Sequence, residues 1–538
     1  MKIQNPILRG FQPDPTIVRA DKKYYIATST FEWFPGVQIF ESENLAHWKL
    51  VAHPLDSLKY ADLRGVAEPG GIWAPNLSYD GNCFYLIYTN IITFGSTFMD
   101  ARSYMICAKD VRGPWSEPVF LTSDGYDLSL FHDDNGRKWL LNVSMDYCSA
   151  TMISGIMIQE YLPEQHCLSG TPVLIYKGTS LGTTEAPNLY KRNGWYYLIT
   201  AEGGTGYKHA VTTARCRTVD GMYETGPDQP LLTSYGNGDR GLQKAGHASL
   251  TDSPSGEWYL VHLCARPVGK EKMCILGRET ALQKLQWTQD GWPKLENGTK
   301  YPDEMIELLE AKQNDIETVP IKMDHSIMEE FDGEEWDSSF QTLRQPLGKR
   351  ASLTARPGYL RLFGGNSLHS HYEQSILAHR QQEFYTETTT RIDFLPESFL
   401  HMAGLVYYYD TLNYYYLYIT RNKEKKKIIN LLCSVFEEVT FPIGEGILIP
   451  EDKEVYLKLK TECETARFSY SFDGKNYQEV EHLLDATVLS DDYYQKKNLW
   501  RFTGAFVGIC CQDMCLKNIY ADFNFFEYKE CQMTMREE

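Results

Sequence analysis

A short phrase occurs five times in the first half of this 538-residue chain, and it constrains the fold more than any other feature. Each copy starts with a small polar residue and a Leu or Ile, continues through a turn rich in Asp, Asn and Gly, and ends in an aromatic run. Such a copy predicts a β-hairpin, because aromatic and β-branched residues favour strands while Asp, Asn and Gly favour turns. The copies are DPTIVRADKKYYIAT from Asp14, APNLSYDGNCFYLIYT from Ala74, DLSLFHDDNGRKWLLNV from Asp127, EAPNLYKRNGWYYLIT from Glu185 and HASLTDSPSGEWYLVHL from His247.

Aligned on their polar residue, the copies are 53 to 61 residues apart. All-strand repeats of this length are typical of the four-stranded blades of a β-propeller. We therefore predict a five-bladed propeller over residues 1–300. A solenoid explains the pattern less well, since solenoid repeats are shorter and more uniform. The aligned residues are Thr16, Asn76, Ser129, Asn188 and Ser249.

One position of the repeat is rich in acids. The innermost strand of each propeller blade lines the central channel, so equivalent positions of different blades converge there. Each acid alone could be a turn residue whose oxygen binds a backbone N–H. Three carboxylates near equivalent positions instead predict a shared site at one end of the channel. The residues two places before the aligned ones are Asp14, Ala74, Asp127, Ala186 and His247, with Glu185 directly before Ala186.

Carboxylates held close together resist ionising together, so their pKa values move apart. One acid can then keep its proton near neutral pH while another stays ionised, and cleavage of a glycosidic bond uses such a pair. The two carboxyl groups stand about 6.5–9.5 Å apart in inverting enzymes and about 5–5.5 Å apart in retaining ones. The sequence does not give the distance between the carboxyl groups, so the residues alone do not distinguish an inverting from a retaining enzyme.

Aromatic side chains and one arginine are candidates for sugar contacts. Phe31 and Trp73 follow or open two of the copies, and aromatic faces pack well against the C–H faces of sugar rings. Core packing is the alternative interpretation of these rings. Arg278, in the stretch GRETALQ, is a candidate donor to sugar hydroxyls, and a surface ion pair with Glu279 is its alternative.

The second half of the chain has a different pattern. Residues 301–322 are acidic and polar, which predicts a linker. Alternating apolar stretches such as GYLRLFG, TTTRIDF and LVYYYD follow, and this period-two pattern is typical of an antiparallel β-sandwich. We predict a sandwich domain over residues 323–538 and interpret its tyrosines as sheet-face packing rather than as a second sugar site. The whole chain is expected to be all-β.

Charge and composition narrow the partners. The net charge of −18 argues against nucleic acid, because a phosphate backbone would be repelled. No stretch approaches the roughly 18 consecutive apolar residues of a membrane helix, and the N-terminus lacks the apolar segment of a signal peptide. Thirteen cysteines are scattered without metal-ligand spacing, which fits reduced thiols. We expect a cytoplasmic protein without a membrane or nucleic-acid partner.

Stretches spread over nearly the whole chain also carry a resemblance to a known family. They include FQPDPTIV, GGIWAPNLSY, SLFHDDNGRKWLLN, TEAPNLYKRNGWYYLITAEGGTGY, LGRETALQ and, past the propeller, GYLRLFGGNSL and GAFVGICCQD. The chain resembles the two-domain β-xylosidases of glycoside hydrolase family 43. The resemblance implies a five-bladed propeller followed by a concanavalin-like jelly-roll sandwich. It also implies exo cleavage of short β-1,4-xylo-oligosaccharides by a single inverting displacement, without a covalent intermediate.

The resemblance assigns roles to individual residues. Asp14 matches the general base that activates water, and Glu185, in TEAP, matches the general acid. Asp127 matches the third acid, which orients the general acid and modulates its pKa. No cofactor is required, although some members hold a water or Ca²⁺ at the histidine matched here by His247, and dimers or tetramers are common among similar proteins. Contacts with the terminal sugar are expected from Phe31, Trp73, Ala74, His247 and Arg278, and from Phe506 of the second domain.

The sequence departs from the family pattern near the site. Ala186 and Asn188 replace the usual Gly and His after the acid, Ala248 follows His247, and residues 142–155 lack the usual Trp and Arg. These departures leave the preferred sugar open, so an α-L-arabinofuranosidase, or an enzyme with both activities, is the alternative. A propeller that only binds sugar is disfavoured because the three acids are intact. A fructan hydrolase is disfavoured because its WMNDPN- and RDP-type motifs are missing.

Overall fold

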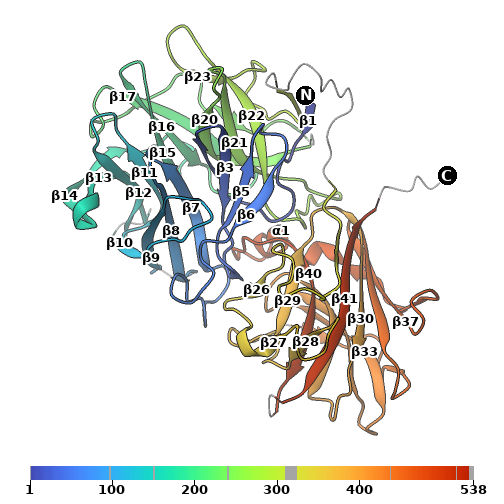
Figure 1. Ribbon diagram of the computed structural model, residues 1–538. Helices are drawn as coiled ribbons and strands as arrows, with labels where there is room; N and C mark the ends of the chain where they lie inside the picture. Colours follow the sequence, from blue (N-terminus) through green and yellow to red (C-terminus); the bar gives the residue numbers. More distant parts are fainter. Residues whose placement is uncertain are drawn as a thin grey trace. The chain divides into compact units, whose positions relative to one another are not determined.

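The computed structural model describes residues 2–95, 98–148, 152–238, 241–308, 324–436, 438–515 and 518–531. The chain divides into two compact units: Met1–Arg266 with Arg278–Lys322, and Pro267–Gly277 with Met323–Glu538. Regular structure in both is almost entirely strand (Figure 1), which confirms the predicted all-β class. Within the described ranges, no helix has the length and apolar character needed to cross a membrane.

The first unit is a five-bladed propeller, as the repeat predicts. Each blade is an antiparallel sheet, and each copy of the repeated phrase forms the hairpin of its inner strand and the next strand. The blades follow one another in chain order, from blue to green in Figure 1. Blade I contains β2 (Thr16–Ala20), β3 (Lys23–Thr28), β5 (Gln38–Ser42) and β6 (Lys49–Ala52); blade II contains β7 (Gly71–Tyr79), β8 (Phe84–Thr93), β9 (Asp100–Ala108) and β10 (Val119–Thr122). Blade III contains β11 (Tyr126–His132), β12 (Lys138–Asp146), β13 (Met152–Leu162) and β14 (Cys167–Tyr176); blade IV contains β15 (Glu185–Arg192), β16 (Trp195–Glu202), β17 (Ala210–Cys216), β18 (Glu224–Thr225) and β19 (Leu232–Thr233); blade V contains β20 (Gln243–Asp252), β21 (Trp258–Ala265), β22 (Glu279–Trp287) and β23 (Pro293–Leu295).

Three short strands and one 3₁₀ turn complete the first unit. β1 (Lys2–Gln4) pairs with β24 (Met305–Glu307), which lies inside the stretch predicted as a linker. Residues 309–322 of that stretch lie outside the described residues. The other two elements are β4 (Trp33–Phe34) and the 3₁₀ turn Pro163–Gln165.

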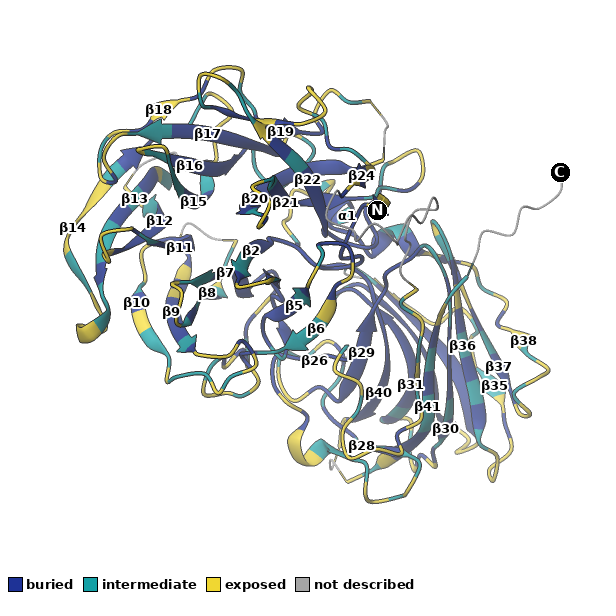
Figure 2. Cartoon of the chain, turned by 45° about the horizontal axis from the view of Figure 1, so that its top comes forward, coloured by how far each residue is buried: buried dark blue, intermediate teal, exposed yellow. Residues whose placement is uncertain are grey.

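Apolar side chains pack between neighbouring blades and hold the inner strands in place. Ile39 of blade I packs with Ile72 of blade II, and further clusters join blades II and III, IV and V, and V and I. Blades III and IV share a polar link, in which Lys191 Nζ lies 2.6 Å from an oxygen of the buried Asp133. Figure 2 shows the inner strands largely buried, while outer strands such as β14 carry exposed residues. The residues that line the channel are therefore held in place by the packing between neighbouring blades.

Four of the five aligned polar residues, all except Ser129, connect the blades by hydrogen bonds of their side chains. Their short side chains reach the backbone or side chains of other inner strands. The repeated residues therefore help to join the five blades into a ring, in addition to forming the blades themselves. The bonds are Thr16 Oγ1 to Pro75 O (3.1 Å), Leu130 N to Asn76 Oδ1 (3.1 Å), Asn76 Nδ2 to Asn188 Oδ1 (3.2 Å), Asn188 Nδ2 to Ala248 O (3.3 Å) and Ile17 N to Ser249 Oγ (3.2 Å).

The five equivalent positions before the aligned residues share an unusual backbone conformation. Each has a positive φ, in the left-handed region that L-residues with a side chain seldom adopt. In blades II to V the strand register also shifts at this point, as in a β-bulge. A bulge redirects the adjoining side chains, and strain of this kind concentrates at functional sites. The φ values are 55° at Asp14, 27° at Ala74, 53° at Asp127, 52° at Ala186 and 49° at His247.

The second unit is a two-sheet sandwich. Its larger sheet contains β25 (Ile327–Glu329), β27 (Ala351–Ser352), β28 (Leu360–Phe363), β30 (Tyr385–Asp393), β36 (Val455–Glu462), β37 (Thr465–Ser471), β38 (Gln478–Glu479), β39 (Leu484–Asp485) and β41 (Tyr520–Glu530). The other sheet contains β29 (Ile376–Arg380), β31 (His401–Tyr408), β32 (Tyr414–Arg421), β33 (Lys427–Val435), β34 (Glu438–Thr440), β35 (Ile447–Leu448) and β40 (Phe506–Asp513). The short elements are β26 (Thr342–Leu343), the 3₁₀ turns Gly348–Arg350 and Ala486–Val488, and α1 (Asp491–Gln495).

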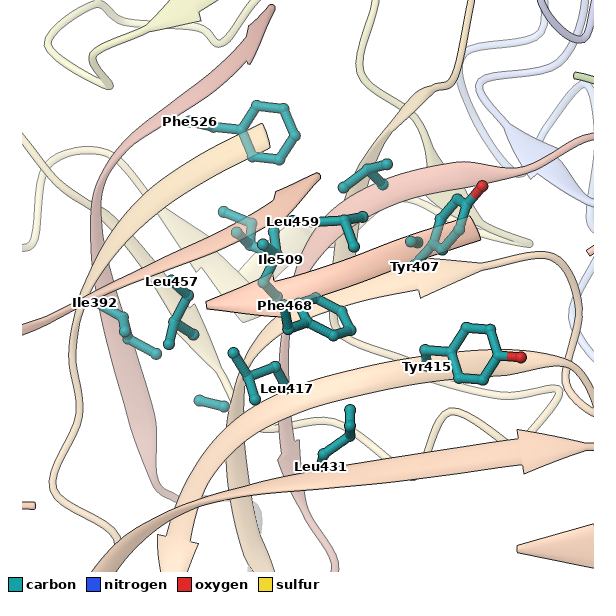
Figure 3. Close-up of a cluster of buried hydrophobic side chains, with 14 of the residues drawn as sticks. Ile392, Tyr407, Tyr415, Leu417, Leu431, Leu457, Leu459, Phe468, Ile509 and Phe526 are labelled. Carbon is teal, nitrogen blue, oxygen red and sulfur yellow. The ribbon is translucent and has the colours of Figure 1, made fainter. Parts of the chain in front are cut away.

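The core of the sandwich lies between its two sheets. Leu457 and Phe468 from one sheet face Leu417 and Ile509 from the other (Figure 3). Tyr407 is fully buried in this core, and its hydroxyl donates to Gln381 Oε1 at 2.7 Å. A buried tyrosine whose hydroxyl has a partner is a packing residue, which agrees with the interpretation of the tyrosines as sheet-face packing.

Candidate active site

The three acids predicted from the repeat meet at one end of the propeller channel. Asp14 and Asp127 are buried, with 5% and 8% of their surface exposed, and Glu185 is partly buried. The charge of Asp14 raises the pKa of both other carboxyl groups, which places the three within electrostatic reach of one another. The structure also brings Arg278 and His247 to the same point. Five residues from four blades thus form one polar cluster.

Asp14 is held as a carboxylate. Arg278 Nη1 donates to Asp14 Oδ1 at 2.8 Å, Ser29 Oγ donates to Asp14 Oδ2 at 2.7 Å, and His247 Nδ1 lies 3.7 Å from Oδ1. Burial by itself would raise the pKa of Asp14, but Arg278, His247 and Ser29 together lower it below its usual value of 3.8. Asp14 is therefore ionised at neutral pH and able to accept a proton.

Glu185 and Asp127 are shifted in the opposite direction. Burial raises the pKa of Glu185 to about 7, and the charge of Asp14 adds to this shift. Burial also raises the pKa of Asp127 well above its usual value, with the charges of Glu185 and Asp14 as further causes. The backbone N–H of Ala186 opposes the shift of Asp127 by a hydrogen bond. The cluster therefore combines one ionised acid with acids that hold a proton near neutral pH.

An aromatic wall adjoins the acids. Phe31 and Trp73 lie with their ring centroids 5.8 Å apart, and Phe11 and Phe94 extend the wall on either side at 5.8 and 5.2 Å. Phe31 exchanges two backbone hydrogen bonds with Ile72. Each of the four rings contacts another aromatic ring of the wall. The interpretation of Phe31 and Trp73 as packing residues is therefore also correct in part.

Gly71 is needed for this wall. Its φ is +100°, and a Cβ atom there would lie 2.2 Å from the backbone oxygen of Phe31. Any side chain at position 71 would therefore push the two segments apart.

Arg278 does not form the surface ion pair considered as its alternative. It is 4% exposed and pairs with Asp14, while Glu279 accepts from Arg266 at 2.7 and 2.8 Å. The guanidinium carbon also lies 5.4 Å from the centre of the Phe31 ring. Arg278 therefore joins the acids to the aromatic wall.

Three residues of the cluster have no counterpart among the sequence predictions. Ser29 binds Asp14, Tyr126 donates to Glu185 Oε2 at 3.0 Å, and the buried His209 ring packs against Gly246, next to His247. Tyr126 directly precedes Asp127 in the repeat, so its place beside an acid was a usable signal. Ser29 and His209 belong to no equivalent positions, and the sequence offers no signal for them.

A calcium ion bound directly to His247, of the kind that some members of the family hold, does not fit the residues around this histidine. Calcium prefers six to eight oxygen ligands. His247 instead faces His209 and the carboxylate of Asp14, and the Arg278 guanidinium already neutralises that carboxylate. A cation bound directly at His247 would meet this positive charge.

Phe506 belongs to the second unit, where it begins β40 and lies 5.7 Å from the Arg380 guanidinium. Its predicted contact with the sugar stays a prediction.

The whole chain is similar to known proteins over both units. Residues 3–293 match the family described as Glycosyl hydrolases family 43, and residues 328–529 match the Beta xylosidase C-terminal Concanavalin A-like domain. The chain belongs to glycoside hydrolase family 43. This family 43 chain is 43% identical to the Beta-xylosidase of Bacillus subtilis (98% of this chain, 100% of the relative) and 40% identical to the Xylosidase/arabinosidase 43B of Humicola insolens (99% and 98%). It superposes on the crystal structure of xylan beta-1,4-xylosidase from Bacillus halodurans with a TM-score of 0.94 and 45% identity, over 98% of this chain and 100% of that one.

Membership of family 43 confirms the recognised resemblance and the concanavalin-like nature of the second domain. It makes the protein a glycoside hydrolase, so the alternatives of a fructan hydrolase and of a propeller that only binds sugar are set aside. The roles of individual residues stay predictions, which the cluster geometry now allows to be stated in atomic terms.

The structure gives a physical account of two departures from the family pattern. Ala186 has a φ of 52°, in the region that glycine favours, so the usual Gly would relieve strain that Ala accepts at about 1 kcal/mol. Asn188 is 7% exposed and bridges Asn76 to the backbone of Ala248. In place of the usual histidine, Asn188 therefore connects the inner strands of blades II, IV and V by hydrogen bonds.

Proposed function

We propose that this protein is an inverting exo-β-1,4-xylosidase that releases xylose from the non-reducing end of short xylo-oligosaccharides. The observation that carries the proposal is the division of proton affinity within the cluster, where Asp14 is ionised and Glu185 keeps a proton up to about pH 7. A hydrolase that works by single displacement needs this pair at the same pH. The names of the similar proteins support xylosides as substrates.

In the proposed reaction, Glu185 transfers its proton to the glycosidic oxygen while the bond from that oxygen to the anomeric carbon breaks. A water molecule attacks the same carbon from the opposite face and gives its proton to Asp14. The products are xylose of inverted configuration and the shortened sugar. Protonated Asp14 and ionised Glu185 then exchange one proton with solvent, which restores the starting state.

Asp127 and Arg278 act on the two reacting acids. Asp127 bonds the backbone N–H of Ala186, next to Glu185, and thereby orients the acid. Arg278 keeps Asp14 ionised and offers its remaining N–H groups to sugar hydroxyls. The terminal sugar packs against Phe31 and Trp73 of the aromatic wall and against the neighbouring Ala74.

The α-L-arabinofuranosidase is the second candidate, because the similar Humicola protein is named for both activities. The same acids would cleave either pentoside, and only the wall contacts would differ. We further propose a cytoplasmic location, imported oligosaccharides as the substrates, and a homodimer or homotetramer. The scattered cysteines, which fit reduced thiols, support the proposed location.

The test is a paired assay on 4-nitrophenyl β-D-xylopyranoside, 4-nitrophenyl α-L-arabinofuranoside and xylobiose. Preference for the xyloside with turnover of xylobiose supports the proposal; preference for the arabinoside favours the second candidate; no activity on any of them refutes both.

Two variants test the roles. Glu185→Ala is expected to lower kcat on xylobiose by about 10²–10⁴-fold but to affect the 4-nitrophenyl xyloside far less, since 4-nitrophenolate leaves without protonation. Asp14→Ala is expected to abolish turnover of both. Equal losses on both substrates in Glu185→Ala would remove the general-acid role, and substantial turnover by Asp14→Ala would remove the general-base role.

A further inference from the structure

Tyr126 is the residue of the cluster whose contact bears most directly on Glu185. Its hydroxyl donates to Glu185 Oε2 at 3.0 Å. Among the described residues, this is the side-chain hydrogen bond that the Glu185 carboxyl group accepts. We propose that Tyr126 is a positioning residue: it holds Oε2 and so leaves Oε1 to carry the proton that passes to the glycosidic oxygen. The proposal deepens the proposed function and rests on the general-acid role of Glu185.

The contact crosses from one blade to the next. Tyr126 begins β11 of blade III and Glu185 begins β15 of blade IV, 59 residues later. Both lie directly before a left-handed residue, Asp127 or Ala186, where the strand register shifts. The same bulge in two neighbouring blades therefore aims the phenol and the carboxyl group at each other.

Tyr126 is fixed independently of Glu185. Its backbone pairs with Val143 on β12, and its ring meets Trp73 edge to face, with centroids 5.7 Å apart and an interplanar angle of 82°. Gly125 allows this close approach, because its φ is +72° and a Cβ there would lie 1.6 Å from the Val143 oxygen. A phenol held on its backbone and on its ring can orient a carboxyl group that it contacts.

The phenol also stays a donor over the working range of pH. Burial raises the pKa of Tyr126 well above its usual value of 10, and the charges of Glu185 and Asp127 add to the shift. The bond strengthens as the acid gives up its proton, because hydrogen bonds to ionised oxygens are stronger than those to neutral ones. Tyr126 thus favours the ionised form of Glu185 and opposes the upward shift that burial causes.

The variant Tyr126→Phe removes one oxygen and keeps the ring. Tyr197→Phe is the control, because Tyr197 is also a buried tyrosine, on blade IV, and its hydroxyl donates to Gly291 O at 2.6 Å, away from the acids. We expect the alkaline limb of kcat/KM on xylobiose, whose leaving group needs the proton of Glu185, to move up by about one pH unit in Tyr126→Phe and to stay in place in Tyr197→Phe. We also expect a larger loss of kcat on xylobiose than on the aryl xyloside, because only xylobiose needs the oriented proton.

An unchanged alkaline limb in folded Tyr126→Phe would overturn the proposal. If the wild-type protein hydrolyses no xyloside, the proposed function fails, and the contact is tested by thermal unfolding instead. Because the hydroxyl favours the ionised carboxyl, the Tm difference between wild type and Tyr126→Phe should grow as pH rises through 7. In the background Glu185→Gln, which does not titrate, that pH dependence should vanish. A Tm difference that is constant with pH in both backgrounds would also overturn the proposal.

Discussion

Replacing Arg278 with methionine should move the acid limb of catalysis. Arg278 Nη1 lies 2.8 Å from Asp14 Oδ1, and both side chains are at least nine-tenths buried. Two unit charges about 4 Å apart interact by about 4 kcal/mol at an effective dielectric constant of about 20, which corresponds to an upper limit of about three pH units. His247 and Ser29 remain beside Asp14 in the variant, so we expect the pKa of Asp14 to rise by about one to two units.

The sign follows from the role of the carboxylate. A base must be ionised to act, so a higher pKa of Asp14 moves the acid limb of kcat/KM to higher pH. The assay is the pH profile on the 4-nitrophenyl xyloside, and Arg278→Lys, which keeps the charge, is the control. KM should also rise in Arg278→Met if the guanidinium binds sugar hydroxyls. An acid limb that stays within about 0.3 pH units of the wild type would refute the claim that Arg278 keeps Asp14 ionised.

Two further variants test how the propeller holds the site. Asn188→Ala should lower the unfolding free energy by about 1–3 kcal/mol, because the Asn76 amide and the Ala248 carbonyl lose their partner across the ring; an unchanged Tm would contradict this. Asp133→Asn should cost about 2 kcal/mol at pH 7 by breaking the bond to Lys191. Burial would raise the pKa of Asp133, but Lys191 and further hydrogen bonds lower it, so the stabilisation is present above the usual pKa of 3.8 and is lost as pH falls through the folded value. The Tm difference between wild type and variant should therefore shrink below about pH 4, and a difference that persists there would exclude the ion pair as its cause.

Much of the site could be predicted because the repeat places equivalent residues at equivalent points. Asp14 and Asp127 occupy the same position in two blades, and Glu185 stands one residue before it in a third, so an alignment of the chain with itself brings them together. Ser29 and His209 fall outside the repeat, and nothing local marks them. Arg278 was a candidate with two interpretations, since a sequence shows a charged residue but not the partner that burial forces on it.

The positive φ at the acids could not be predicted from the sequence pattern alone. Asp, Ala and His share no sequence signal for positive φ, yet all five equivalent positions adopt it. In blades II to V the conformation coincides with a bulge in the inner strand, which is a property of strand pairing rather than of the residue itself.

The sequence by itself determined the number of blades, the strands that form them, the sandwich that follows and the acids that face the channel. These properties depend on local alternation and on spacing along the chain, which are written residue by residue. Only the tertiary structure decided which acid is ionised and which holds a proton. That outcome depends on burial and on partners distant in sequence, such as Arg278 for Asp14, 264 residues away, and Tyr126 for Glu185, 59 residues away. Electrostatic energy is set by distance in space and by the exclusion of water, and neither exists until the blades close around the channel.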